Sequence, residues 1–82
     1  MSLPQEKIKP RPSILALEIG QDTITATLSD GREISIPTVW FERLASASKD
    51  QLMDFEISPS GYGIHWPQID EDISVKAFTD GL

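Results

Sequence analysis

The strict alternation of residues 23–28 constrains the fold of this chain more than any other feature. Threonine fills every other position of this stretch, and apolar residues fill the rest. A period of two is typical of a β-strand with one buried and one wet face, and β-branched residues favour that structure. The same apolar phase resumes at Ile34 and Ile36. We therefore predict two antiparallel strands, residues 23–28 and 32–36.

The length of the loop between these strands follows from the two phases, because residues opposite each other in antiparallel strands lie on one face. A two-residue turn at Asp30-Gly31 would set a threonine opposite Ile34 and mix the faces. A three-residue loop, residues 29–31, instead pairs apolar with apolar residues. It also gives Gly31 the left-handed position that such loops need. We predict this loop, with Ile24 opposite Ile36 and Ala26 opposite Ile34.

One more strand is expected before this hairpin. Residues 14–19 are mostly apolar, and alternation predicts an inner face formed by Leu15, Leu17 and Ile19. The parity argument requires an even number of residues in the following turn, with Gln21-Asp22 at its tip. The first part of the chain therefore predicts a three-stranded antiparallel meander.

Two short helices are predicted after the meander. Pro37 has no N–H to donate and ends the third strand. Thr38 is placed to cap a helix over residues 39–47, whose apolar stripe would consist of Trp40, Phe41, Leu44 and Ala45. Residues 48–51 have the spacing of a capping box and predict a second helical turn that ends near Met53.

Residues 55–58 and 64–66 predict a second hairpin. A turn with Ser60-Gly61 at its tip would set Ile57 opposite Ile64 and Phe55 opposite Trp66. In this phase Trp66 faces the core, and we expect Trp40 to be buried as well. His65 then lies on the wet side of the strand.

A last helix is predicted over residues 75–79, with Asp72 or Ser74 as its cap. The acidic run at residues 70–72 would then be stabilised by the helix dipole. The whole pattern predicts an α+β fold in which a three-stranded N-terminal meander and a C-terminal hairpin combine with two or three short helices. We assign residues 1–12 to a flexible leader and residues 13–82 to a single domain.

The charges are unevenly distributed along the chain. The formal net charge is −6, and residues 50–82 contain seven acidic residues and one basic residue, Lys76. Such a surface repels phosphate backbones, so we expect no direct nucleic-acid binding. It suits a protein partner with a basic surface, although excess acid also serves solubility alone.

The sequence contains no cysteine, which excludes disulfides and thiolate metal sites. No apolar run approaches the roughly 20 residues needed to span a bilayer. Residues 1–9 lack the apolar core of a signal peptide. We therefore expect a cytoplasmic protein without a membrane partner.

Residues 61–73 concentrate the side chains best suited to binding, since they hold the only Tyr, the only His and an acidic triplet. A divalent metal bound by His65, Asp70 and Asp72 is one interpretation. A single His without Cys does not fit the usual zinc ligand sets, and no nucleophile motif accompanies His65 as an acid or base. We expect no catalytic residue, metal or cofactor. The candidate partner-binding surface consists of Tyr62, His65, Asp70, Glu71 and Asp72.

From Gly61 the chain reads Gly-Tyr-Gly-Ile-His-Trp-Pro, followed after two residues by Asp-Glu-Asp-Ile-Ser-Val. These motifs resemble those of a small bacterial family, domain of unknown function 2442. Similarity to the family extends to the Asp30-Gly31 hairpin, the Trp40-Phe41-x-x-Leu44 stretch and Phe55-x-Ile57. The resemblance therefore covers roughly residues 14–80. It implies a compact α+β domain, found alone or fused to a helix-turn-helix, and toxin–antitoxin-like pairing with a small neighbouring protein. It implies no catalytic residues.

From these observations we expect a non-enzymatic protein-interaction domain, an antitoxin-like or regulatory partner of a small neighbouring protein. Two alternatives remain open. One is a homodimeric structural domain that pairs through a sheet edge or the threonine-rich face. The other is a metal-dependent enzyme.

Overall fold

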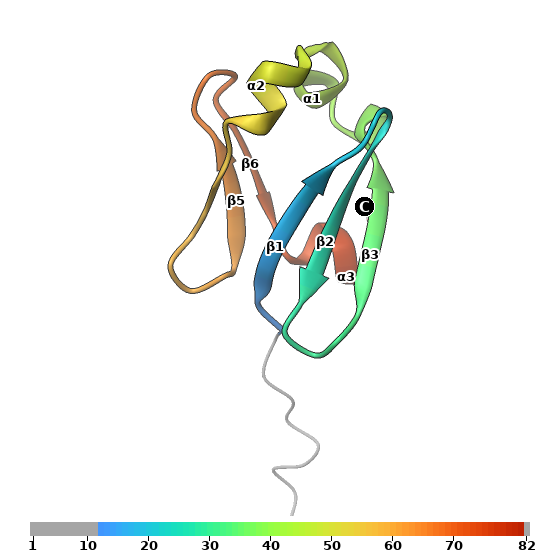
Figure 1. The fold of residues 1–82 in the computed structure, drawn as a ribbon, viewed down its shortest axis with the longest axis vertical. Coiled ribbons are helices and arrows are strands. Elements are labelled where there is room, and N and C mark those ends of the chain that lie inside the picture. The colour runs from blue at the N-terminus through green and yellow to red at the C-terminus, as the bar shows by residue number, and fades with distance from the viewer. Residues whose placement is uncertain (1–11, 82) are drawn as a thin grey trace, which may run out of the picture.

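The computed structural model describes residues 12–81 and contains two three-stranded antiparallel sheets that share one core (Figure 1). Sheet A has the order β1-β2-β3 and is formed by Ile14–Ile19, Thr23–Leu28 and Glu33–Pro37. Sheet B has the order β4-β5-β6 and is formed by Glu56–Ile57, Gly63–Trp66 and Glu71–Ser74. Three short α-helices complete the described residues and confirm the predicted α+β class: α1 (Glu42–Ser46), α2 (Lys49–Met53) and α3 (Lys76–Thr79).

Sheet A confirms the predicted register. Ile24 pairs with Ile36 and Ala26 with Ile34. The three-residue loop is present: the backbone N–H of Leu28 donates to the Arg32 carbonyl at 2.8 Å, and Gly31 has φ +96°. The turn between β1 and β2 has the predicted even length, with Ile19 opposite Ile24.

The predicted inner face of β1 is wrong at one position. The register of β1 against β2 shifts between Ile14 and Ala16, so a β-bulge inserts one residue into the strand. Ile14 is buried, whereas Leu15 is 62% exposed. Beyond the bulge Leu17 and Ile19 recover the inner phase and pack against the core.

The predicted helix over residues 39–47 is interrupted. Thr38–Trp40 form a single 3₁₀ turn, and α1 begins only after Phe41, whose backbone is extended at φ −128° and ψ 113°. The break changes the helical phase, which leaves the predicted core residues Trp40 and Ala45 exposed. Thr38 is no side-chain cap; it is buried, and its hydroxyl donates to the Asp22 carbonyl at 3.2 Å. The capping box at Ser48 and Gln51 is present and opens α2, as predicted.

Sheet B contains a strand that the sequence analysis missed. Residues 71–74 form β6 and pair with β5, so the predicted C-terminal hairpin has a third strand. Asp72 therefore lies in a strand and caps no helix, and the acidic run is not at a helix N-terminus. The Oγ of Ser74 accepts the backbone N–H of Lys76 at 3.2 Å, just before α3.

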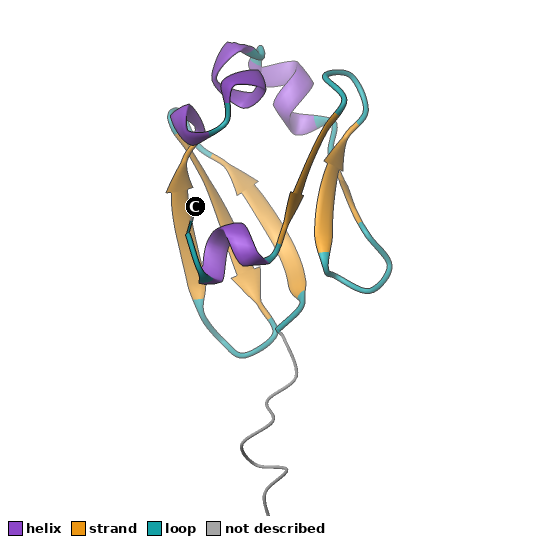
Figure 2. Cartoon of the chain, turned by 180° about the vertical axis from the view of Figure 1, so that it is seen from behind, coloured by secondary structure: helices purple, strands orange, loops and turns teal. Residues whose placement is uncertain are grey.

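The two sheets are joined at one edge and bridged at the other. β1 contacts β4, and the backbone N–H of Ile14 donates to the Gly61 carbonyl at 2.7 Å. On the opposite side α3 contacts both β3 and β6 (Figure 2), and α1 and α2 lie across one end of the sheets (Figure 1). The core between them includes the largest fully buried side chains, Trp66, Ile24, Leu28, Leu44, Ile64 and Val75.

The predicted leader, residues 1–12, lies outside the described residues except for Pro12. Among residues 12–81, no helix is long and apolar enough to cross a membrane.

Candidate functional site

β5 sets the orientation of His65. Its neighbours Ile64 and Trp66 are both buried, and the Trp66 indole N–H donates to the Leu52 carbonyl at 2.9 Å. Phe55 packs against the Trp66 ring at a centroid distance of 6.5 Å. Because side chains alternate along a strand, these anchors direct His65 to the outer face of sheet B, as predicted.

Three polar side chains form a row across this outer face. His65, on the central strand, is paired with Glu56 of β4 on one side and with Asp72 of β6 on the other. The Nδ1 atom of His65 lies 2.8 Å from Oδ1 of Asp72. Their side chains are 40% and 76% exposed, so this pair adds only about 0–1 kcal/mol to stability. The row is therefore available to a ligand at little cost to the fold.

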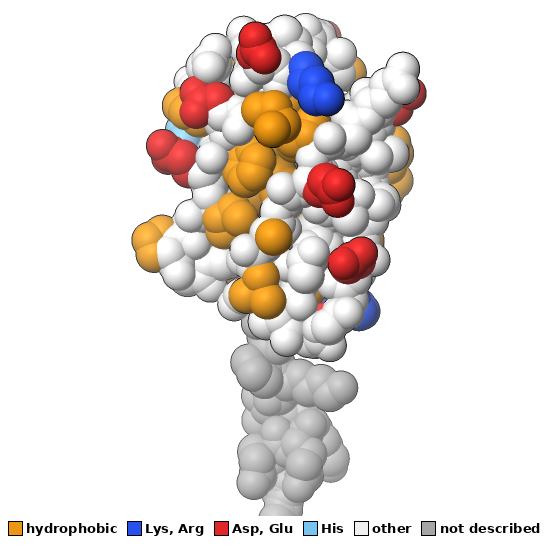
Figure 3. Space-filling model, in the orientation of Figure 1, with side chains coloured by type: hydrophobic (Ala, Val, Ile, Leu, Met, Phe, Trp, Pro, Cys, Tyr) orange, Lys and Arg blue, Asp and Glu red, His pale blue; other side chains and the backbone are white. Residues whose placement is uncertain are grey.

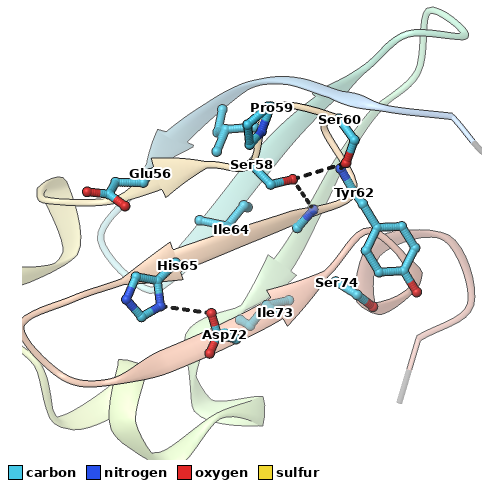
Figure 4. Close-up of a pocket in the computed structure, with 12 residues that line it drawn as sticks. Glu56, Ser58, Pro59, Ser60, Tyr62, Ile64, His65, Asp72, Ile73 and Ser74 are labelled. Atoms are coloured by element: carbon cyan, nitrogen blue, oxygen red, sulfur yellow. Dashed lines mark hydrogen bonds and ion pairs between the residues drawn. The ribbon is translucent and has the colours of Figure 1, made fainter.

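The hairpin between β4 and β5 shapes the other end of the same face. The Ser58 hydroxyl accepts the backbone N–H of Gly63 at 3.1 Å, and the Ser60 hydroxyl accepts that of Tyr62 at 3.2 Å. Gly63 has no side chain and lies opposite Ser74, which leaves the face hollow at this point. Tyr62 is 46% exposed and lies over the Ser74 end of the hollow (Figure 4).

Together these residues line a groove of about 760 Å³, which we call the outer groove. It runs over residues 56–60, 62–65 and 72–74. Figure 4 shows the His65–Asp72 pair toward one end and Tyr62 at the other. Its lining contains two carboxylates, Glu56 and Asp72, and no Lys or Arg. The groove therefore presents an aromatic wall and a negative end.

The structure divides the five predicted site residues. Tyr62, His65 and Asp72 all line the outer groove. Glu71 pairs with Trp66 in the register and so lies on the opposite face of the sheet from Asp72. Asp70 occupies the turn before β6 with φ +54°, and its carbonyl accepts Arg43 Nη1 at 2.7 Å. The acidic triplet is therefore not one surface.

Sequence reasoning missed Glu56, Ser58 and Ser74 as residues of this face. The signal for Glu56 was present, because the predicted pairing of Ile57 with Ile64 places the preceding residue opposite His65. The same pairing sets Ser58 opposite Gly63, so its signal was present too, whereas Ser74 depended on β6, which was not predicted.

The donor set does not form a metal centre. Among residues 12–81, no group of three or more His, Cys, Asp or Glu side chains is placed to hold a metal ion. The strand register explains part of this, since Asp72 meets His65 while Asp70 lies in the turn beside Arg43. What the outer groove offers is hydrogen bonding and ion pairing on an open surface.

A second surface feature lies where the two sheets meet. Figure 3 shows apolar side chains gathered in a band over the region where β1 approaches sheet B. At the contact of β1 with β4, Leu17, Ile19 and Ile57 are only partly buried. The edges of two strands meet there without a ladder between them among the described residues, which leaves part of the core edge open.

The fold defines a small α+β domain with an open groove on the outer face of sheet B. The model of the family described as "Protein of unknown function (DUF2442)" matches residues 14–81, and the chain belongs to this family. A crystal structure of a protein of unknown function from Rhodospirillum rubrum ATCC 11170 is similar, with 28% identity and a TM-score of 0.78. The match covers 89% of this chain and 90% of that one.

The fold is also similar to the solution NMR structure of an uncharacterised protein from Chromobacterium violaceum. That match has 24% identity and a TM-score of 0.71, and covers 94% of this chain and 70% of the other. A search of curated proteins gave no match.

Proposed function

We propose that this protein is a non-enzymatic interaction domain whose outer groove binds a basic segment of a small partner protein. The observation that carries the proposal is the composition of the groove. Two carboxylates flank His65 on an open face, and the lining contains no Lys or Arg. Unbalanced acid beside an aromatic wall favours a ligand that brings its own positive charge.

The geometry suits an extended segment. A Lys or Arg side chain between Glu56 and Asp72 would form charge-assisted hydrogen bonds, which are about twice as strong as neutral ones. The hollow at Gly63 leaves room for the ligand backbone, and Tyr62 offers a large contact area with few torsions to fix. Charge would then speed the encounter, while the aromatic contact would slow dissociation.

The exposure of the outer groove to solvent favours binding over catalysis. The His65 and Asp72 side chains are 40% and 76% exposed, so the groove does not exclude water as sites for acid–base chemistry do. In this proposal the domain acts in the cytoplasm as an antitoxin-like or regulatory subunit, which agrees with the pairing implied by the family resemblance.

Co-purification at low salt with matched variants tests the proposal. The double variant Glu56→Gln with Asp72→Asn removes the two groove charges and keeps the side-chain shapes. Glu33→Gln with Asp50→Asn removes the same charge from exposed positions outside the groove. We expect the wild type and the control to retain the same basic protein, and the groove variant to lose it.

Retention by the wild type should also fall as the ionic strength rises past about 0.15 M, where the Debye length is about 8 Å. Equal retention by the groove variant and the control would overturn the proposal.

The apolar band at the junction of the sheets favours a second candidate, a homodimer. Leu15 is 62% exposed on β1, an edge strand of sheet A. Exposed apolar side chains at a strand edge are typical of pairing surfaces. Sedimentation of the wild type and of Leu15→Glu would separate the two candidates: a dimer that Leu15→Glu dissociates supports this one, and a monomer at every concentration removes it.

A further inference from the structure

The chain has two parts of opposite charge. Residues 1–11 contain three basic residues and one acidic residue, whereas residues 12–82 contain four basic and twelve acidic residues. The net charges are therefore +2 and −8. Lys7, Lys9 and Arg11 bring to the chain the kind of charge that the outer groove lacks.

The basic segment also joins the described structure beside the groove. Pro12 and Ser13 are already half-buried. The Ser13 hydroxyl donates to the Ser60 carbonyl at 3.1 Å, and the next residue, Ile14, bonds to the Gly61 carbonyl at 2.7 Å. Ser60 lines the outer groove at its Tyr62 end. The described chain therefore begins, at Pro12 and Ser13, beside the Tyr62 end of the groove.

The segment is long enough to reach the negative end. From Tyr62 to His65 the groove follows three strand steps of about 3.3 Å each, or about 10 Å. A polyproline-like chain advances about 3.1 Å per residue, so Lys9 reaches about 12 Å from Ser13. Pro4, Pro10 and Pro12 favour that extended form, and proline-rich segments dock well on aromatic walls.

We infer that residues 1–11 dock in the outer groove of their own chain and compete there with the basic partner. The segment runs from Ser60 past Tyr62, and Lys9 and Lys7 each ion-pair with one of the two carboxylates, Glu56 or Asp72. The occupant needs no high affinity, because a short tether gives an effective concentration in the millimolar range. Intrinsic binding with a Kd of about 0.1–1 mM would then weaken binding of an outside partner about two- to tenfold.

Paramagnetic relaxation in the full chain tests the docking without any partner. The absence of cysteine allows a nitroxide to be attached at one site through Gln5→Cys, which in the docked chain lies within four residues of both lysines. We expect the amide signals of Tyr62, Gly63 and His65 to lose most of their intensity. The signals of Thr25 and Ser35, on the wet face of sheet A, should keep theirs.

Charge variants show whether the basic residues hold the segment. Lys7→Gln with Lys9→Gln should restore the groove signals, whereas Lys49→Gln with Lys76→Gln, an equal loss of charge in α2 and α3, should not. Uniform weak broadening, or broadening that survives Lys7→Gln with Lys9→Gln, would overturn the inference. Mixing nitroxide-labelled chains with unlabelled ¹⁵N chains completes the test: groove broadening that arises only between chains also overturns it.

This inference uses the groove of the proposed function, and the two can fail separately. If the groove signals are unaffected while Glu56→Gln with Asp72→Asn still loses the partner, the proposed function stands and the docking falls. If the groove signals broaden while that variant keeps the partner, the docking stands and the proposed function falls. If both stand, Lys7→Gln with Lys9→Gln binds the partner about two- to tenfold more tightly than Lys49→Gln with Lys76→Gln.

Discussion

The two sheets have the same construction, but their outer faces carry different side chains. Each has three antiparallel strands and buries one face in the shared core. On the outer face of sheet A, Thr25 and Ser35 form a hydrogen bond with each other. Glu18 is paired with Thr25, and Glu33 with Thr27, on the same face. On sheet B the outer row is Glu56, His65 and Asp72, and no basic residue lines the groove around it. Both outer faces carry carboxylates, but only the face of sheet B combines them with His65 and borders Tyr62 in the outer groove.

This difference shows that the core and the outer face impose separate demands on the same strands. Ile64 and Trp66 hold β5 in place from the inside, so the outer position between them is free to carry His65. The Thr25–Ser35 pair has the corresponding place on sheet A, whereas the single His and the single Tyr of the sequence both line the outer groove. Function is therefore expected on sheet B, and stability should depend on both sheets together.

The largest expected effect tests whether the two sheets share one core. Trp66→Ala removes a fully buried ring and its hydrogen bond to the Leu52 carbonyl, at a cost of about 3–5 kcal/mol. Ile24→Ala in sheet A should cost about 2–5 kcal/mol. Either loss is a large part of the roughly 4–12 kcal/mol expected for a domain of this size.

Hydrogen exchange followed by NMR distinguishes shared from separate cores. Within each variant, the protection factors of the Ile36 and Ile64 amides should fall by the same ratio. This is expected because the two sheets unfold in one transition. The matched control is Trp40→Ala, which removes an exposed ring and should cost much less. Loss of protection confined to the substituted sheet would show that the sheets unfold independently.

The contrast between the sheets also explains what the sequence could predict. Sheet A follows from alternation over two full strands, and the loop length follows from face parity. The bulge in β1 was not predictable because Ile14 and Leu15 are both apolar, so either phase fits the pattern. Its cause lies in the pairing with β2, which no local pattern records.

In sheet B, strand β6 was missed because its apolar pattern is too short. β6 carries a single apolar residue, Ile73, and its acidic start has the composition of a helix N-terminus. The outward phase of His65 was predictable from its two buried neighbours. The separation of Glu71 from Asp72 required the strand itself, because only a period of two sends consecutive carboxylates to opposite faces.

A smaller loss of stability is expected where the β4–β5 hairpin meets the start of β1, a contact between Gly61 and Ser13 that we call the joint between the sheets. Gly61 has φ +75°, and a Cβ at this position would lie 2.6 Å from Ser13 Cβ. Gly61→Ala should lower the free energy of unfolding by about 1–2 kcal/mol because alanine is strained in the left-handed backbone conformation. Displacement of Ser13 by the added Cβ should lower it further. Gly31→Ala is the matched control, since its φ is +96° and no atom lies within 4 Å of the added Cβ.

Urea unfolding of both glycine variants measures the joint. The loss in the free energy of unfolding beyond that of Gly31→Ala is the contribution of the close approach between sheet A and the β4–β5 hairpin. If both variants lose the same amount, the approach at Ser13 contributes nothing and the joint relaxes freely.

The smallest expected effect concerns the carboxylate in the sheet A hairpin. The backbone N–H of Arg32 donates to Asp30 at 3.1 Å and its guanidinium at 2.8 Å, and these bonds hold the pKa of Asp30 below its ordinary value of 3.8. A carboxyl whose pKa is lower in the folded state stabilises the fold above its unfolded pKa, and that contribution disappears as the pH falls through the folded value. Asp30→Asn keeps the shape of the side chain and removes the titration. The wild type should have a higher urea midpoint than Asp30→Asn at pH 6, and this difference should shrink as the pH falls below 3.8. A difference that is constant with pH would show that Asp30 acts only through its shape.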